Sequence, residues 1–193
     1  MKRQVVAPIE QGMRFFTPQL FLQANSHDDE VADRADRAWE AAIKKYTKHL
    51  NAIDSKLHAD VRRLSKICLH DAELIGFETN VPYPVPLPSF EPPYRPSMPH
   101  MDSAVLFLRD RNSNQLLIYS LSDEVDLTPT KNWPFPRCQK LWLYDEVDLD
   151  ERGGYVHRVL FNDGSVVKIP FWSVVMKVSP KEQVVETAAA NSN

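Results

Sequence analysis

The sequence predicts an α+β fold in which a long N-terminal helix and short helices pack on an antiparallel β-sheet of about five or six strands. The first observation behind this prediction is a change of period near residue 70. Apolar residues recur every three or four positions before it, as in helices, and alternate after it, as in strands. The second is that short connections join the last strands, which favours antiparallel pairing over strand–helix–strand units.

A long helix is the strongest single prediction, starting at Ser26 and ending near residue 57. Its apolar residues step by three or four positions and form one continuous stripe for a partner surface. They are Val31, Ala35, Trp39, Ala42, Tyr46, Leu50, Ile53 and Leu57. Shorter helices are predicted over 18–24, where Thr17 caps the first turn and Pro18 opens it, and over 59–67.

Six strands are predicted over 72–79, 103–109, 115–121, 140–148, 154–162 and 165–178. Asp163 and Gly164 predict a tight hairpin turn between the last two strands. Eight prolines lie between Pro82 and Pro99, and because each removes an amide donor, 81–100 is expected to be an extended loop. The chain is therefore expected to form one domain over 13–178. Its helical part covers about 17–68 and its β part about 72–178, with flexible ends at 1–12 and 180–193.

Composition narrows the class of protein. The 193 residues carry a formal net charge of −3, which does not supply the basic field of a general nucleic-acid binder. No apolar run is long enough to cross a membrane, and the start of the chain lacks the pattern of a signal peptide. The two cysteines, Cys68 and Cys138, form no C-x-x-C motif and are typical of a reducing compartment. We therefore expect a cytoplasmic protein with no nucleic-acid or membrane partner.

The pentapeptide "DEVDL" occurs twice, at 123–127 and at 145–149. Strict alternation would turn Asp123 and Asp145 inward with the neighbouring leucines. Burial of an unpaired carboxylate costs several kcal/mol of stability. One solution is a strand end or bulge at each aspartate. The other is a cation or a basic partner, for which Arg109, Arg158 and Lys168 are available. We favour ordinary strand ends, and no metal site is predicted.

Histidines offer a second candidate site. His70 and Asp71 lie at the junction between helices and sheet, where polar side chains often form hydrogen bonds with backbone N–H and C=O groups that lack a partner. His157 falls on an alternating face and could lie close to Asp71 or Asp145. Such a His–Asp pair could support general-base chemistry, although a hydrogen-bonded structural histidine is the favoured interpretation. No phosphate loop, nucleophile elbow or zinc spacing occurs in the sequence, and no cofactor is expected.

Aromatic residues offer a third candidate. Trp142 and Tyr144 are expected on the strand face opposite Leu141 and Leu143. That face could form an exposed binding patch, but we favour its packing beneath the long helix, whose apolar stripe has to be covered.

Several segments together resemble a family of short bacterial proteins classed as a domain of unknown function. They are "RFFTPQL", "DDEVADRADRAWEAAIKKY", "ICLHDAEL", "WLYDEVDL" and "HRVLFNDGSVVKIPFWSV". The resemblance covers most of 13–178 and leaves out the proline-rich loop, where the family has a shorter link. The "LHDA" junction before an antiparallel sheet is also similar to some immunity proteins of bacterial toxin systems. These likenesses imply an α+β fold and a bacterial cytoplasmic setting, and they supply no catalytic residues.

These observations predict a non-enzymatic module that binds another protein, with an immunity-like role as one form of that function. The candidate binding residues are Trp142, Tyr144, Asp123 and Glu146. The alternative is a cation-dependent hydrolase, whose candidate catalytic residues are His70, Asp71, Asp145 and His157. The identity of the partner and the oligomeric state are left open.

Overall fold

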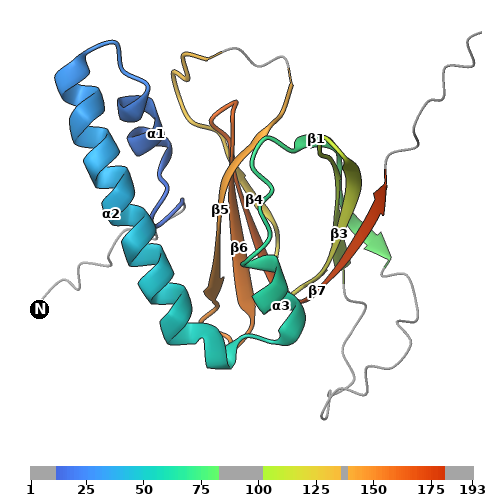
Figure 1. Cartoon of the computed structure of the whole chain (residues 1–193). Coiled ribbons are helices and arrows are strands. Elements are labelled where there is room, and N and C mark those ends of the chain that lie inside the picture. Colours follow the sequence, from blue (N-terminus) through green and yellow to red (C-terminus); the bar gives the residue numbers. More distant parts are fainter. Residues whose placement is uncertain (1–11, 83–101, 136–138, 181–193) are drawn as a thin grey trace, which may run out of the picture.

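The computed structural model describes residues 12–82, 102–135 and 139–180. It shows the predicted α+β fold, with helices packed against an antiparallel sheet (Figure 1). The predicted flexible ends and proline-rich loop fall almost entirely outside these residues. No described helix is long and apolar enough to cross a membrane.

The helical part contains α1 (Pro18–Ala24), α2 (Asp29–Ile53), the short 3₁₀ helix η1 (Asp54–Lys56) and α3 (Ala59–Leu64). Thr17 caps α1 as predicted, because its hydroxyl accepts a hydrogen bond from the Leu20 amide at 3.2 Å. The predicted start of the long helix at Ser26 is wrong by two residues. Asp28 is the N-cap of α2 and accepts from the Val31 amide at 3.1 Å, while the Ser26 hydroxyl accepts from the Asp28 amide in the preceding turn.

The predicted apolar stripe of α2 is confirmed. Every position of the stripe from Val31 to Leu57 is buried or half-buried, whereas the opposite face is exposed. Figure 1 shows α2 running beside β5, with α1 between the upper part of the helix and the sheet. The 3.6-residue period therefore fixes which face of the helix is covered.

The described part of the chain forms a sheet of seven antiparallel strands. They are β1 (Glu73–Pro82), β2 (Asp102–Arg109), β3 (Ser113–Leu121), β4 (Asp126–Thr128), β5 (Trp142–Leu149), β6 (Tyr155–Phe161) and β7 (Val166–Pro180). Their order is β1-β2-β3-β7-β6-β5, and β4 pairs with β7. Six of the strands match the prediction. The short edge strand β4, which includes the end of the first "DEVDL" copy, was not predicted.

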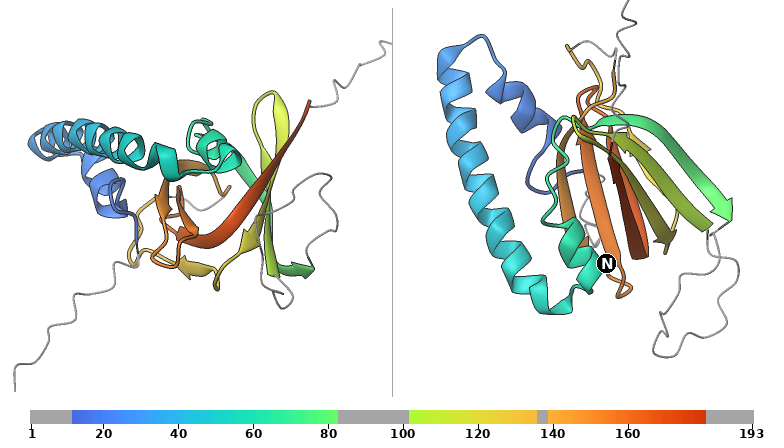
Figure 2. Two further views of the ribbon diagram at one scale, coloured as in Figure 1. Left: turned by 90° about the horizontal axis from the view of Figure 1, so that it is seen from below. Right: turned by 45° about the vertical axis from the view of Figure 1, so that its right-hand side comes forward.

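The sheet curls until its two ends meet. Glu73 at the start of β1 forms an antiparallel bridge with Leu141, just before β5. Two further backbone hydrogen bonds hold this seam, Leu74 N–H to Lys140 O at 2.8 Å and Trp142 N–H to Ala72 O at 2.9 Å. Figure 2 shows β7 crossing between the β1–β3 part and the β5–β6 part of this curled sheet. One end of the sheet is thereby closed like a barrel.

Two apolar cores follow from the curl. The larger lies inside the sheet, where α3 contributes Val61 and Leu64, and it includes Trp142 and Phe171. The smaller lies between α2 and the outer face of β5 and β6. It is built from residues such as Phe16, Trp39, Leu143, Tyr144 and Leu160.

The hairpin between β6 and β7 turns at Asp163 and Gly164, as predicted. Gly164 has a φ of 76°, and a Cβ atom there would clash with the indole ring of Trp133. The turn therefore needs glycine both for its backbone conformation and for the close approach of the ring. Asp163 supports the turn by accepting hydrogen bonds from the Ser165 amide and hydroxyl.

Candidate functional site

The second "DEVDL" copy lies on β5, and a bulge decides which way its side chains point. Trp142 pairs with Phe161 and Tyr144 pairs with Leu160, so Leu143 is an extra residue in the ladder. This extra residue shifts the alternation by one position. The expectation that Trp142 and Tyr144 share a face is therefore wrong, because Trp142 lies in the inner core and Tyr144 lies beneath α2.

Asp145 does point inward, as strict alternation after the bulge requires, and it meets polar partners there. Its carboxylate accepts from Trp142 Nε1 at 3.0 Å and contacts His157 Nε2 at 3.2 Å. The other ring nitrogen of His157 lies 2.8 Å from the Tyr119 hydroxyl. The four side chains form one hydrogen-bonded chain that joins β3, β5 and β6.

The chemistry available to this chain is limited by burial. His157 and Tyr119 are fully buried, while the Asp145 side chain is 19% exposed. Burial raises the pKa of Tyr119, and the Asp145 charge raises it further, so the phenol stays protonated as a donor. Both ring nitrogens of His157 already have partners. The arrangement satisfies buried polar groups and thereby orients three strands.

Glu146 points to the opposite face of β5 and is 1% exposed. Its carboxylate accepts three backbone hydrogen bonds, from the amides of Arg14, Phe15 and Phe16, at 2.6 to 2.8 Å. This carboxylate therefore fastens the segment before α1 to the sheet. A buried carboxylate is stable when several charge-assisted bonds replace its water shell.

Asp148 lies on the same face as Glu146 and sits within a cluster of basic groups. Arg14 Nη1 and His49 Nε2 bond its two oxygens, and Arg158 Nη1 lies 3.7 Å away. Burial alone would raise the pKa of Asp148, but hydrogen bonds from Arg14, His49 and the Leu149 amide outweigh it and hold the pKa below its ordinary value. The cluster links α2, β5, β6 and the N-terminal segment.

His70 and Asp71 lie in the turn before β1. His70 Nδ1 is 2.6 Å from the Leu143 carbonyl oxygen, and Nε2 is 3.6 Å from Asp71 Oδ1. The His70 ring lies 5.3 Å from the ring of Tyr144, which places this pair on the α2 side of β5. The four candidate catalytic residues thus come together as two pairs on opposite faces of one strand. Among the described residues, no group of three or more His, Cys, Asp and Glu side chains is placed to hold a metal ion.

The four candidate binding residues have different environments. Trp142 and Glu146 are buried, and Tyr144 packs on Trp39 with ring centroids 4.4 Å apart, which matches its favoured placement beneath the helix. Asp123 is at the surface and pairs with Arg152 at 2.9 Å. A binding role for these residues stays a prediction.

A groove that the sequence reasoning missed lies over β1, β2, β3 and the end of β7. It has a volume of about 670 Å³, and its lining includes Ile75, Phe107, Leu116, Lys177 and Val178. Three of these large apolar side chains are strongly exposed: Ile75 (52%), Phe107 (40%) and Val178 (52%). The sequence held one signal, the run "AVLFL" in β2, where consecutive apolar residues put apolar side chains on both faces of the strand.

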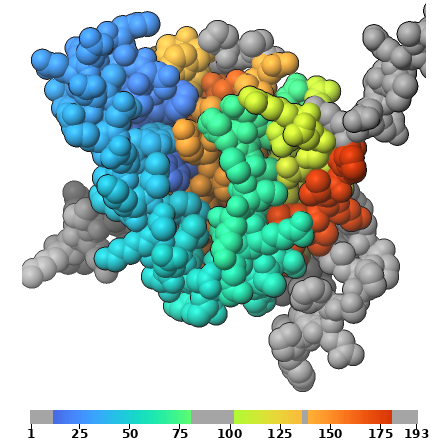
Figure 3. Space-filling view, in the orientation of Figure 1, coloured from blue at the N-terminus to red at the C-terminus, as the bar shows by residue number. Residues whose placement is uncertain are grey.

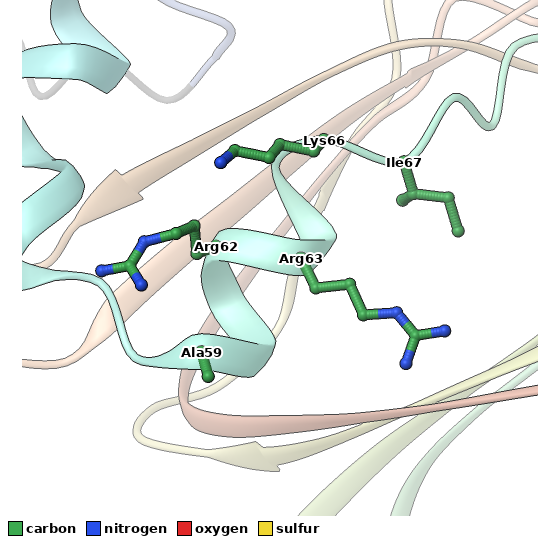
Figure 4. Close-up of a pocket in the computed structure, with 5 residues that line it drawn as sticks. All are labelled: Ala59, Arg62, Arg63, Lys66 and Ile67. Atoms are coloured by element: carbon green, nitrogen blue, oxygen red, sulfur yellow. The ribbon is translucent and has the colours of Figure 1, made fainter.

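A second hollow lies beside α3 and is lined by Ala59, Arg62, Arg63, Lys66 and Ile67 (Figure 4). Arg62 is held by Asp54 Oδ1 and by the carbonyl oxygens of Asp54 and Leu57. Figure 4 shows the Arg63 side chain pointing away from those of Arg62 and Lys66. The three basic groups do not converge on one point, so the hollow lacks the geometry of an anion site.

Comparison with known proteins gives no relative for this chain. No protein-family model matches it, and no curated protein or solved structure shows a significant match.

Proposed function

We propose that the protein is a protein-binding module and that its partner docks in the groove over β1, β2, β3 and β7. The observation that carries this proposal is the exposure of two large apolar side chains, Ile75 and Phe107, on the paired strands β1 and β2 along one groove. Five large hydrophobic residues are strongly exposed in the described part of the chain, and three of them line this groove. Ile75 and Phe107 come from the paired strands β1 and β2, and the partly buried Leu116 lies beside Phe107 on β3, whereas the Val178 side chain is on the opposite face of β7. Single exposed apolar residues are ordinary, whereas a contiguous group supports an interaction surface.

The polar residues around the groove indicate the chemistry of the partner. Lys177 is exposed and lies in the lining, and so does Arg109, whose guanidinium is bound to Glu73 at 2.7 Å. An apolar centre with a polar, charged border is the usual anatomy of a protein interface. The expected partner therefore presents apolar side chains flanked by acidic ones. A bacterial toxin with such a surface would fit the immunity-like role that is one form of the predicted binding function.

The hydrolase alternative has weaker support. Asp145 and His157 bond each other and bond Trp142 and Tyr119, which uses the groups that would have to reach a substrate or a cation. His70 and Asp71 are on the other side of β5. The groove is the better supported site because its apolar side chains are exposed and free to contact another molecule.

A matched pair of variants tests the proposal. Ile75→Ser with Phe107→Ser removes the apolar lining, whereas Leu127→Ser removes a side chain of similar exposure (53%) on β4. In chemical cross-linking from a lysate of the source cells, we expect the wild-type protein and Leu127→Ser to capture the same partner. The groove variant should lose that capture by at least about tenfold, because truncation of each apolar anchor at the centre of an interface costs about 1 kcal/mol or more.

The same comparison shows how the proposal fails. If the groove variant captures that protein as well as Leu127→Ser does, the groove is not the docking surface. If the toxin hypothesis holds, growth rescue against neighbouring toxin genes should show the same difference between the two variants.

A further inference from the structure

The exposed face of α2 carries charges that are sorted by sign along the helix. Its N-terminal half presents Asp29, Asp33, Asp36 and Glu40, and its C-terminal half presents Lys44 and Lys48, all exposed. With 3.6 residues per turn, steps of three and four residues keep these six side chains on one face. Lys56 follows in η1 and is exposed too. One continuous surface is therefore mainly acidic at one end and basic at the other.

The helix dipole does not account for this order. Its effect falls off within the first and last turns of a helix, so it explains Asp29 but not Asp36, Glu40 or Lys44. Pairing along the helix accounts for little of it. In the described part of the chain, α2 forms one ion pair along its own length, Arg34 with Glu30 at 3.7 Å. Within that part, the charges of the middle turns have no ion-pair partner in the single molecule.

The position of α2 leaves this face open. The apolar stripe packs against the sheet through Trp39, Ala42 and Tyr46, and Figure 1 shows the helix along the margin of the molecule. In the space-filling view, the outer side of α2 is not covered by another described element (Figure 3). The charged face is therefore available to another molecule.

We propose that a second copy of this chain docks on this face, with the two α2 helices side by side and antiparallel. A two-fold axis between Glu40 and Lys44 sets Glu40 of one copy opposite Lys44 of the other. The same register sets Asp36 opposite Lys48 and Asp29 close to Lys56. Because the axis is two-fold, each pairing occurs twice and the association closes as a dimer.

The order of the charges favours a second copy over other partners. A nucleic acid or an anionic membrane would attract the lysine half of the face and be repelled by the acidic half, whereas an antiparallel copy matches both halves at once. Arg37 also lies in the acidic half, and the same register sets it opposite the uncharged Thr47. Ile43, 47% exposed and next to Lys44, adds apolar surface close to the axis. The inference concerns a surface other than the groove and does not rest on the proposed function.

Salt dependence is the first test. Exposed ion pairs are weak and are screened by salt, so the dimer should form at high protein concentration and low ionic strength. Analytical ultracentrifugation of the full chain should show a monomer–dimer equilibrium whose Kd weakens by at least about tenfold between ~0.02 M and ~0.5 M NaCl. A protein that is monomeric in both buffers, or a dimer indifferent to salt, overturns the proposal.

A charge swap is the second and sharper test. Asp36→Lys and Lys48→Glu each place like charges across the axis, so each variant alone should be monomeric where the wild-type protein dimerises. An equimolar mixture of the two should dimerise again, because the mixed dimer sets a lysine opposite a carboxylate at both of its 36/48 contacts. Lys66→Glu is the matched control, since it makes the same change of charge at an exposed position just after α3 and should leave dimerisation intact.

The mixture also separates a lost interface from a lost fold, because a misfolded variant would not be rescued by mixing. Single variants that dimerise as the wild-type protein does, or a mixture that stays monomeric, show that α2 is not the interface.

Discussion

The two "DEVDL" copies have identical sequences and very different environments. In the first copy, Asp123 and Glu124 are exposed in a loop, and Leu127 on β4 is 53% exposed. In the second copy, Glu146 and Asp148 are buried within β5, at 1% and 7% exposure. The valine at the centre faces the inner core in both copies, as Val125 and as Val147.

The difference comes from what covers each strand. β4 pairs with β7 and has no described helix over it, whereas β5 lies beneath α2 and the segment before α1. Those neighbours bring the amides of residues 14–16 together with Arg14 and His49, which bond the carboxylates of the second copy. Identical local sequence therefore has little influence on burial compared with the partners that the fold supplies. Three sets of measurements sharpen this comparison.

Replacing the glutamate of each copy should give the largest contrast. Glu146→Ala leaves three backbone amides, one buried and two part-buried, without an acceptor and should lower the free energy of unfolding by about 3–5 kcal/mol. Glu124→Ala changes an exposed side chain and should stay within about 0.5 kcal/mol of the wild-type value. Urea unfolding of the two variants measures both. Equal effects would mean that the Glu146 bonds contribute little to the fold.

The first aspartate of each copy should give a smaller contrast. Asp145→Ala removes the acceptor for Trp142 and the partner of His157, and should cost about 2–4 kcal/mol. Asp123→Ala loses an exposed ion pair with Arg152, which contributes at most about 1 kcal/mol. Thermal and urea unfolding of both variants check the difference. An Asp145→Ala protein as stable as Asp123→Ala would contradict the role of the buried network.

The second aspartate of β5, Asp148, should affect how the stability of the protein depends on pH. The pKa of Asp148 lies below its ordinary value of 3.8 in the folded protein. The unfolded chain therefore takes up this proton at a higher pH than the folded protein does. Its contribution to stability is present above the unfolded pKa of 3.8 and is lost as the pH falls through the folded pKa.

Urea unfolding at several pH values below about 5 tests this, because Asp148→Asn removes the titrating group. The variant should be less stable than the wild-type protein at neutral pH and should lose less stability on acidification. Part of the acid sensitivity should remain, because the pKa of Asp163 is lowered too. Burial raises that pKa, but hydrogen bonds from Ser165 and the charge of Lys140 outweigh the effect of burial. If the free energy of unfolding of Asp148→Asn falls with decreasing pH as steeply as that of the wild-type protein, Asp148 does not cause the predicted pH dependence.

Periodicity was sufficient to predict most of the fold. The stripe from Val31 to Leu57 and the alternation of six strands follow from packing rules that act along the chain. The bulge at Leu143 was not predictable, since it arises from pairing with β6 and has no glycine or proline to mark it. The strand β4 was missed because three residues are too few to show alternation.

The candidate sites were predicted less well than the fold, because they depend on contacts between distant segments. The sequence suggested that His157 could approach Asp145, and the structure joins them. Nothing local indicated that Glu146 would bind the amides of residues 14–16, some 130 positions away. The groove was missed because Ile75, Phe107 and Leu116 come from three strands and become neighbours only through the pairing of β1, β2 and β3.

The seam between Glu73 and Leu141 has a consequence for how the chain folds. The antiparallel pairs β5–β6 and β6–β7 connect strands that are close in sequence. Their loop-closure entropy is small, so these pairs can form early. The seam joins residues 73 and 141, so the entropy cost of closing this long loop has to be met before its backbone hydrogen bonds can stabilise the sheet. We expect it to be the last part of the sheet to assemble and the first to open, with amide protons there exchanging with solvent sooner than those of the inner strands.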